Sequence, residues 1–363
     1  MIIICYYLYV VSKQILILVS VMEIGSFFNL YPNGNPFAVR DHSAPHDVFM
    51  ASGRQAIKHV VETLECKKCL VPNYLCESVH GCFNNFDYYR IGSDFSIDVQ
   101  YLHKIVREEG RDYDLILITN FFGKVDTNIS DVVSLCRDHD IIILEDFTHN
   151  LFSNELYGDV CIASFRKILP TPFGAILRSN TYRLGVKRIP SAEFVCVNLV
   201  KLLGTFLKNS TWLKWLWRPM LVYSENAMDS VEYAGDDFIN RFFYNYYYDV
   251  DILRIRRNNI EHLESGLKKH NLMQDTYFCY TIECASEKER DALRAHMTKC
   301  NVYCPIYWPL DFDNRGECNH ELNKKILSFP IDQRYDIPHM EHIIGCYNSF
   351  IADYPGGFPK GAN

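Results

Sequence analysis

Short apolar runs alternate with helical segments between about residue 50 and residue 180, and this alternation constrains the fold more than any other feature. The runs at 115–118 and 141–144 are continuously apolar, as expected for strands that are covered on both faces. Between them, apolar residues recur at helical spacing over 129–136. Strands that alternate with helices predict a three-layer α/β domain with a mostly parallel sheet.

The same periodicities predict further elements and a second domain. Strands are predicted at 69–71, 86–91, 160–165, 175–177 and 277–282, and helices at 54–65, 98–109, 253–269 and 340–351. The stretch 190–260 is rich in Trp, Leu, Phe and Tyr and predicts packed helices, whose apolar residues form either core or an interface face. We expect a large domain over 22–250 and a smaller α+β C-terminal domain over 251–363.

Composition and charge exclude several classes of protein. The chain has 363 residues, of which 48% are hydrophobic and 22% charged, as in ordinary globular proteins. Its net charge of -7, its pI near 6.0 and the lack of a basic run argue against nucleic-acid binding.

The 14 cysteines lack the spacing of a disulfide scaffold, and many lie in apolar runs, which favours reduced thiols and a cytoplasmic location. The pair Cys66 and Cys69 has the CxxC spacing of a zinc motif, with Cys76, His80 and Cys82 downstream. Because no second CxxC follows, we interpret these residues as unpaired thiols and predict no metal.

The N-terminus allows two interpretations. Residues 2–22 are strongly apolar but are interrupted by Ser12-Lys13-Gln14. A spanning helix needs about 20 apolar residues, and a central lysine costs roughly 2.5–3.5 kcal/mol there. The segment is either a membrane anchor or translated sequence upstream of a start at Met22. We favour the second interpretation for residues 1–21, and expect membrane contact only if 2–22 are retained.

Residues Ser52-Gly53-Arg54 stand directly before the predicted helix at 54–65. The first turn of a helix has free N–H groups and the positive end of the helix dipole, so it can bind a phosphate. Glycine would let the backbone approach such a group closely. Taken alone the signal is weak, because a serine before a helix is most often only a cap.

Two further segments follow predicted strands. The acid Asp146, in the run Glu145–His149, comes directly after the strand at 141–144, where ligands of open α/β sheets bind. An acid there can pair with a protonated pyridine nitrogen. The run Ser164-Phe165-Arg166-Lys167 ends the next strand, and its lysine can form a Schiff base with an aldehyde.

The order and spacing of these segments are more specific than any one of them. In this order they resemble the DegT/StrS-like sugar aminotransferases, which are fold-type-I enzymes dependent on pyridoxal 5'-phosphate (PLP). The resemblance runs from about Met22 to Ile351. It is carried by SGRQAI at 52–57, VPNY at 71–74, NFFG at 120–123, EDFTH at 145–149, SFRK at 164–167 and LSFPID at 327–332.

The resemblance implies an aspartate-aminotransferase-like three-layer fold and a role for each matched residue. It makes Lys167 the Schiff-base lysine and proton shuttle, and pairs Asp146 with the pyridine nitrogen. His149 takes the place of a glutamine beside the ring. Cys76 occupies the position where the family usually has an aromatic residue stacked on the ring.

The phosphate end of the cofactor is likewise assigned by the resemblance. It places the phosphate at Ser52, Gly53 and Arg54, where backbone N–H groups are available, and adds the hydroxyl of Ser164. Asn245, in the run YNYYYD, weakly resembles an asparagine that reaches the phosphate of a partner subunit. The family's active sites are shared in this way across a homodimer.

The activity implied is transfer of an amino group from glutamate to a keto group of a nucleotide-linked sugar, with Tyr74, Tyr307 and Trp308 as candidate pocket residues. Alternatively, these three aromatic residues belong to the hydrophobic core and contact no substrate. Three departures from the family pattern stand out: Cys76, the reduced glycine-rich stretch at 172–174, and a lysine three rather than five residues after its serine.

Other functions remain open. A PLP-dependent dehydratase or lyase would use His149 as its base. A non-catalytic relative that keeps the fold for binding is suggested by Cys76 and Phe173. A membrane-tethered protein of glycan assembly would use residues 2–22.

Overall fold

The computed structural model describes residues 23–29, 41–42, 47–108, 112–179, 181–185, 191–208, 210–230, 238–248, 251–308 and 320–354. The apolar N-terminal extension at 1–21 lies outside the described residues, and its two interpretations stay predictions.

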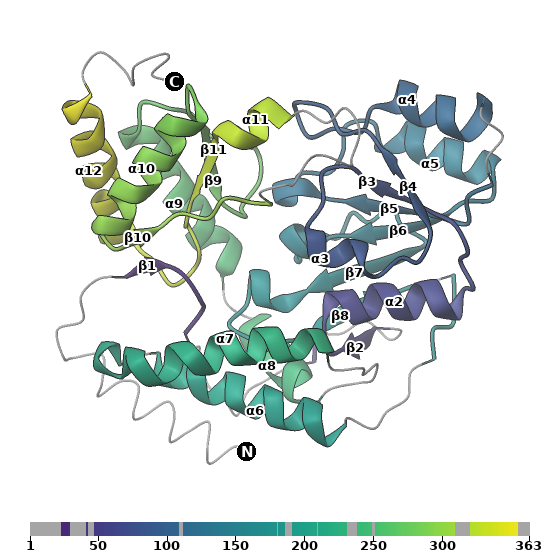
Figure 1. Ribbon diagram of the computed structural model, residues 1–363, viewed down its shortest axis with the longest axis horizontal. Helices are drawn as coiled ribbons and strands as arrows, with labels where there is room; N and C mark the ends of the chain where they lie inside the picture. The colour runs from purple at the N-terminus through teal and green to yellow at the C-terminus, as the bar shows by residue number, and fades with distance from the viewer. Residues whose placement is uncertain are drawn as a thin grey trace. The chain divides into compact units, whose positions relative to one another are not determined.

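A seven-stranded sheet has the strand order β2-β8-β7-β6-β5-β3-β4 (Figure 1). Its strands are β2 (Val48–Met50), β3 (Cys69–Pro72), β4 (Phe86–Tyr89), β5 (Leu115–Thr119), β6 (Ile142–Asp146), β7 (Val160–Ser164) and β8 (Ala175–Arg178). Strand β3 is parallel to β4 and β5, and β6 is parallel to β7. Strand β8 is antiparallel to β7 and β2. The predicted α/β class with a mostly parallel sheet is confirmed.

Helices and short turns connect these strands. The helices are α2 (Gly53–Thr63), α3 (Glu77–His80), α4 (Val99–His103), α5 (Ile129–Asp138), α6 (Ala192–Leu207), α7 (Lys214–Ser230), α8 (Phe238–Tyr248), α9 (Ile252–Gly266), α10 (Glu287–Lys299), α11 (His320–Lys325) and α12 (Ile337–Asp353). The turns are the π-helical η1 (Lys104–Glu108) and the 3₁₀ turns η2 (Phe121–Gly123), η3 (Thr148–Asn150), η4 (Phe165–Lys167) and η5 (Thr211–Leu213).

Most of the predicted elements are present, several of them with bounds shifted by a few residues. Two of the differences have a clear structural form. Strand β4 ends at Tyr89 rather than at residue 91, because Ile91 leaves the sheet and forms an isolated bridge with Ile97. The helix predicted at 98–109 changes from α to π geometry at Lys104, which apolar spacing does not reveal. Strand β5 is buried along its whole length, as its uninterrupted apolar sequence predicted.

The chain divides into two compact units. One holds Phe27–Cys66 and Leu144–Val250, and the other holds Met22–Ser26, Lys67–Ile143 and the chain from Asp251 onward. The predicted division at residue 250 between a large and a small domain stays a prediction.

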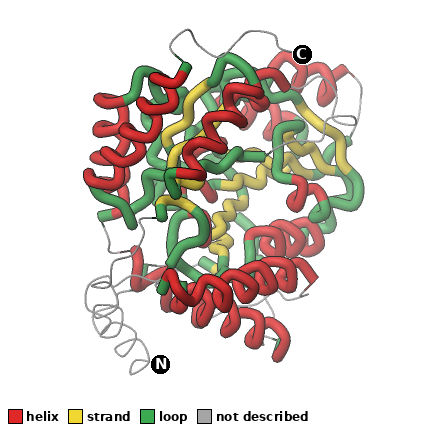
Figure 2. Tube along the Cα trace, turned by 60° about the vertical axis from the view of Figure 1, so that its left-hand side comes forward, coloured by secondary structure: helices red, strands yellow, loops and turns green. Residues whose placement is uncertain are grey.

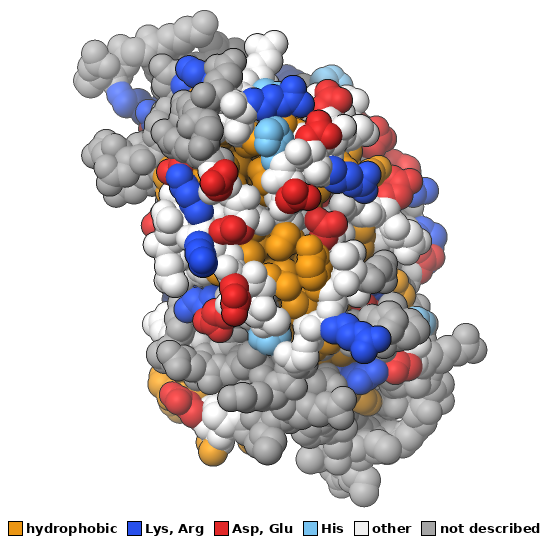
Figure 3. Space-filling model, turned by 90° about the vertical axis from the view of Figure 1, so that its right-hand side faces the viewer, with side chains coloured by type: hydrophobic (Ala, Val, Ile, Leu, Met, Phe, Trp, Pro, Cys, Tyr) orange, Lys and Arg blue, Asp and Glu red, His pale blue; other side chains and the backbone are white. Residues whose placement is uncertain are grey.

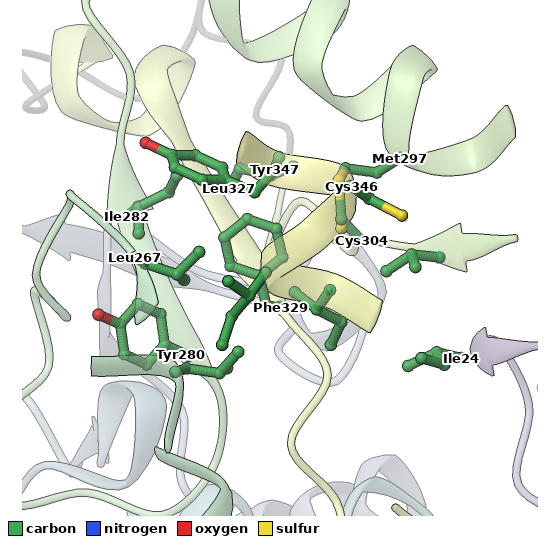
Figure 4. Packing of buried hydrophobic residues seen from close by; sticks show 14 of the residues in the cluster. Ile24, Leu267, Tyr280, Ile282, Met297, Cys304, Leu327, Phe329, Cys346 and Tyr347 are labelled. Atoms are coloured by element: carbon green, nitrogen blue, oxygen red, sulfur yellow. The ribbon is translucent and has the colours of Figure 1, made fainter. Parts of the chain in front are cut away.

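The C-terminal part of the second unit has its own small sheets and core. Strand β9 (Tyr280–Glu283) pairs antiparallel with β11 (Ile326–Phe329), and β1 (Ile24–Gly25) pairs parallel with β10 (Val302–Tyr303). Figure 4 shows buried side chains from these strands and from the helices, including Leu327, Phe329 and Tyr347, packed together. Burial of such side chains stabilises this part by roughly 1.5–3 kcal/mol each.

Helices α6 and α7 lie side by side in the first unit (Figures 1 and 2). On their inner side, Phe194, Val197 and Met228 pack with Ala51 and Phe173. The two helices and the turn η5 between them also expose large apolar side chains, which together we call the α6–α7 face: Leu199, Leu203, Trp212, Trp215, Leu216, Val222 and Tyr223.

Elsewhere the surface has a mixed character. On the face drawn in Figure 3, Lys and Arg side chains are interspersed with Asp and Glu around a patch of hydrophobic side chains. Among the described residues, no helix is both long and apolar enough to span a bilayer, and no group of three or more His, Cys, Asp or Glu could hold a metal ion.

Candidate functional site

The candidate site is built on the ends of β6 and β7. Asp146 is the last residue of β6 and Ser164 the last of β7. The two strands are parallel, and Asp146 lies opposite Ile162 in the register, so both strands end at the same edge of the sheet. This is the edge at which open α/β sheets bind their ligands.

The carboxylate of Asp146 is partly buried and is held by Thr148. Its Oδ1 accepts a hydrogen bond of 3.0 Å from the backbone N–H of Thr148. Burial raises the pKa of Asp146, against the opposing effects of the Thr148 hydrogen bonds and of the positive charge of Lys167. A second cation beside this acid would favour its ionised form, as the protonated nitrogen of a pyridine ring would.

The neighbouring acid Glu145 has a structural role. Successive side chains of a strand point to opposite faces, and Glu145 is buried. Its Oε2 accepts hydrogen bonds from the backbone N–H groups of Tyr157 and Gly158, at 2.6 and 2.8 Å. Glu145 therefore anchors the loop before β7, and Asp146 is the acid available to the site.

The start of α2 lies beside the end of β7. The hydroxyl of Ser52 caps the helix by accepting from the N–H of Gln55 at 3.3 Å. A Cβ atom at Gly53 would stand 3.4 Å from the Cβ of Ser164. The positive end of an 11-residue helix and a serine hydroxyl are thus brought together, which suits a phosphate group.

Lys167 ends the 3₁₀ turn η4 directly after Ser164, and its side chain is exposed. Its charge is close enough to Asp146 to lower the pKa of that acid. The turn itself is fixed by its other two residues. Phe165 is fully buried and stacks on Tyr244 with the ring centroids 4.8 Å apart.

Arg166, the residue before Lys167, is ion-paired with Glu225 of α7. Glu225 is also paired with Lys201 of α6, whose ammonium group lies 5.2 Å from the ring centroid of Phe173. The two cations keep the pKa of Glu225 below its ordinary value, although burial alone would raise it. A network of three charges therefore holds the turn that carries Lys167.

The remaining predicted site residues lie in different surroundings. His149 is buried in the turn η3, three residues after Asp146. Asn245 is buried on α8, where its Oδ1 accepts from the N–H of His42 at 2.9 Å and its amide donates to Asp41 at 3.3 Å. The predicted contact of Asn245 with a partner's cofactor stays a prediction.

Cys76 and the predicted pocket aromatics belong to the second unit. Cys76 precedes α3, and its Sγ lies 3.3 Å from the hydroxyl of Ser78. The hydroxyl of Tyr74 donates to the backbone carbonyl of Tyr307 at 3.0 Å, and the rings of Tyr74 and Trp308 meet edge to face at 5.2 Å. The three aromatics cluster together, and their contact with a substrate stays a prediction.

Two residues around the site were not found by sequence reasoning. Thr148 contacts both Asp146 and Ser164, and a threonine two residues after an acid is a turn pattern that could have indicated it. Glu225 had no local signal, because it is 59 residues from Arg166.

The described residues fit PLP. A helix start and a serine hydroxyl suit its phosphate, a carboxylate suits its ring nitrogen, and a lysine amine suits its aldehyde. When bound, PLP supplies an electron sink for carbanions formed at the substrate.

Comparisons by sequence gave no match, either to models of protein families or to curated proteins. Comparison of structures gave several matches at low identity. Helicobacter pylori PseC, an aminotransferase involved in the biosynthesis of pseudoaminic acid, is 11% identical with a TM-score of 0.64, over 92% of this chain and 100% of that one. A DegT DnrJ EryC1 StrS aminotransferase from Brucella abortus is 16% identical with a TM-score of 0.57, over 84% and 86%.

A third match carries a cofactor. The ntda protein of Bacillus subtilis, solved with bound PMP, is 13% identical with a TM-score of 0.58, over 84% of this chain and 73% of that one. The chain thus has the fold of the DegT-type sugar aminotransferases, which are fold-type-I PLP enzymes. The fold expected from the resemblance is confirmed.

Proposed function

We propose that this protein is a PLP-dependent aminotransferase that moves an amino group from glutamate to a keto group of a nucleotide-linked sugar. The observation that carries the proposal is the meeting of Gly53, Asp146, Ser164 and Lys167 within one compact unit. Each of these residues has a chemistry that matches one end of PLP. The sugar substrate is supported by the activities named for the proteins of the same fold.

In this proposal, each residue has one task. Lys167 would hold the cofactor through its amine and would carry a proton at its Nζ when that amine is free. Asp146 keeps the pyridine nitrogen protonated, and His149 lies beside the ring. The first turn of α2, with Ser52, Gly53 and Arg54, and the hydroxyl of Ser164 bind the phosphate.

A spectrum of the purified protein tests the cofactor. We expect visible absorbance from lysine-bound PLP that is lost on reduction with borohydride, and mass spectrometry should then find the label on Lys167. The variant Lys167→Ala should not be labelled. The matched control is Lys58→Ala, since Lys58 is exposed on α2, and it should behave as the wild type. A label on another lysine would overturn the assignment.

Adding glutamate to the loaded protein tests the reaction. A transaminase converts the bound cofactor to its amine form and releases 2-oxoglutarate in equal amount. A dehydratase or lyase would leave the cofactor unchanged with glutamate alone, and a non-catalytic relative would retain little cofactor. Release of 2-oxoglutarate without a keto-sugar present therefore identifies a transaminase, and the amount of cofactor retained separates the other two functions.

We also infer that the protein forms a homodimer through the α6–α7 face. This face holds seven of the 12 exposed large hydrophobic side chains found among the described residues. Surfaces of this kind mark contact sites with other molecules. A second copy is proposed as the partner because the resembled family shares its active sites across a homodimer. The face is also close in sequence to the site network, since α7 carries Glu225, which is paired with Arg166 beside Lys167.

The oligomeric state tests this inference. We expect a dimer by light scattering and a monomer for the double variant Trp212→Ser, Trp215→Ser, whose side chains are 75% and 72% exposed. Leu272→Ser is the matched control, because Leu272 is exposed in the other unit. A double variant that remains dimeric would place the interface elsewhere.

A further inference from the structure

Thr148 stands between the two residues that face opposite ends of the proposed cofactor. Its hydroxyl oxygen accepts a hydrogen bond of 3.0 Å from the backbone N–H of Ser164. Its own backbone N–H donates to Asp146 Oδ1, also at 3.0 Å. Its side chain is buried, so these contacts are shielded from water.

The direction of these hydrogen bonds determines how the Thr148 hydroxyl can use its own proton. A threonine hydroxyl has one proton to donate and lone pairs to accept. Since the oxygen accepts from Ser164, its proton remains available to another acceptor. The Thr148 side chain lowers the pKa of Asp146, as a hydroxyl that favours the ionised carboxylate would. The backbone N–H and the side chain of Thr148 therefore both favour the ionised form of the same acid.

We propose that Thr148 is a positioning residue, which couples the end of β7 to Asp146 and holds that carboxylate ionised and oriented toward the ring nitrogen. This inference rests on the proposed function for its purpose, but the network itself is independent of any cofactor. The chain of contacts runs from the start of α2 through Ser164 and Thr148 to Asp146.

The groups around Asp146 act on its pKa in opposite directions. Burial raises the pKa of Asp146, and the neighbouring Glu145 acts in the same direction. Lys167 opposes them, but its amine is also the group that would hold the aldehyde of the cofactor. The Thr148 hydrogen bonds are then the contribution from this chain that keeps favouring the carboxylate.

The full-length protein without added cofactor provides the first test. Carbon-13 NMR of labelled aspartate, with Asp146→Asn to assign the signal, measures the titration of Asp146. Hydrogen bonds to a charged group are strong, so Thr148→Val should move the midpoint about 1 to 2 pH units higher. Thr148→Ser keeps the hydroxyl and should restore the wild-type midpoint.

Thr171→Val is the matched control. Thr171 is equally buried, and in the part of the chain described here its hydroxyl oxygen has no hydrogen-bond partner. If Thr148→Val does not fold, the comparison is made with Thr148→Ala. A midpoint that is the same in the wild type, in the hydroxyl-deleting variant and in Thr171→Val would overturn the proposal.

A second measurement separates this inference from the proposed function. Each variant is titrated with PLP and followed by its visible absorbance over a range of pH. We expect Thr148→Val to show the absorbance of ring-deprotonated cofactor at a lower pH than the wild type. If no variant and no wild-type protein binds PLP, the proposed function fails, while the NMR titration still decides the role of Thr148.

Discussion

Removal of the carboxylate of Glu225 should be among the most damaging single changes in the first unit. Glu225 lies between Arg166 and Lys201 and is the acid paired with both. The side chain of Lys201 is only 6% exposed, whereas that of Arg166 is 32% exposed and can be hydrated. The variant Glu225→Gln therefore leaves one cation buried without its counter-charge.

The size of the effect follows from that difference in exposure. Removing one partner of a buried pair costs about 3–5 kcal/mol. Only one of the two cations here is fully buried, so we expect a loss of about 3 kcal/mol in the free energy of unfolding. Lys201→Met should cost less, about 1 kcal/mol, because a buried ammonium is replaced by an apolar side chain while Arg166 keeps its partner.

Urea unfolding of the three variants, including the double variant, measures these values. The double variant Glu225→Gln, Lys201→Met should recover part of the loss of Glu225→Gln, because no buried cation is left unpaired. Since the pKa of Glu225 is lowered in the folded state, its stabilising effect should be present above about pH 4.3 and fade as pH falls through the folded pKa. Equal losses in the single Glu225→Gln and double variants would refute the reasoning.

Three further outcomes are expected. Gly174→Ala should lower the free energy of unfolding by about 2–4 kcal/mol, as measured by thermal or urea unfolding. The reason is that Gly174 has φ +103° and that a Cβ there would stand 2.7 Å from the Cβ of Asn240. A smaller loss would contradict this prediction. Gly53→Ala should change the free energy of unfolding by no more than about 1 kcal/mol, since the added Cβ meets only ordinary contacts. It should nevertheless weaken PLP binding at least about tenfold in an absorbance titration. Unchanged affinity would show that Gly53 is not part of the phosphate site. Because the folded-state pKa of Asp146 is raised, the cofactor-free wild type should lose stability relative to Asp146→Asn as pH rises above about 3.9, and parallel curves would contradict this.

The sequence predicted the parts of the fold and site that depend on local pattern. The continuous apolar run at 115–118 is a strand buried along its length, and the acid after the run at 141–144 is at a strand end. The sequence also predicted that Asp146 and Lys167 lie close together, because parallel neighbouring strands end at the same edge of a sheet.

The contacts that the sequence did not predict join distant segments. The pairing of Arg166 with Glu225 depends on where α7 packs, which local periodicity does not determine. Thr148 had no predicted role of its own, although its hydroxyl contacts the end of a different strand. The change from α to π geometry at Lys104 likewise leaves the apolar spacing unaltered.

The two adjacent acids at the end of β6 lie on opposite faces of the strand and have different roles. Glu145 accepts hydrogen bonds from backbone N–H groups of a loop, while Asp146 accepts one from Thr148 on the opposite face of the same strand. Side-chain length is matched to each task, so a shift of this strand by one residue would place the anchoring acid where the acid of the site belongs. Alignment of distant homologues at this strand must therefore be accurate to one position before either acid is assigned a function.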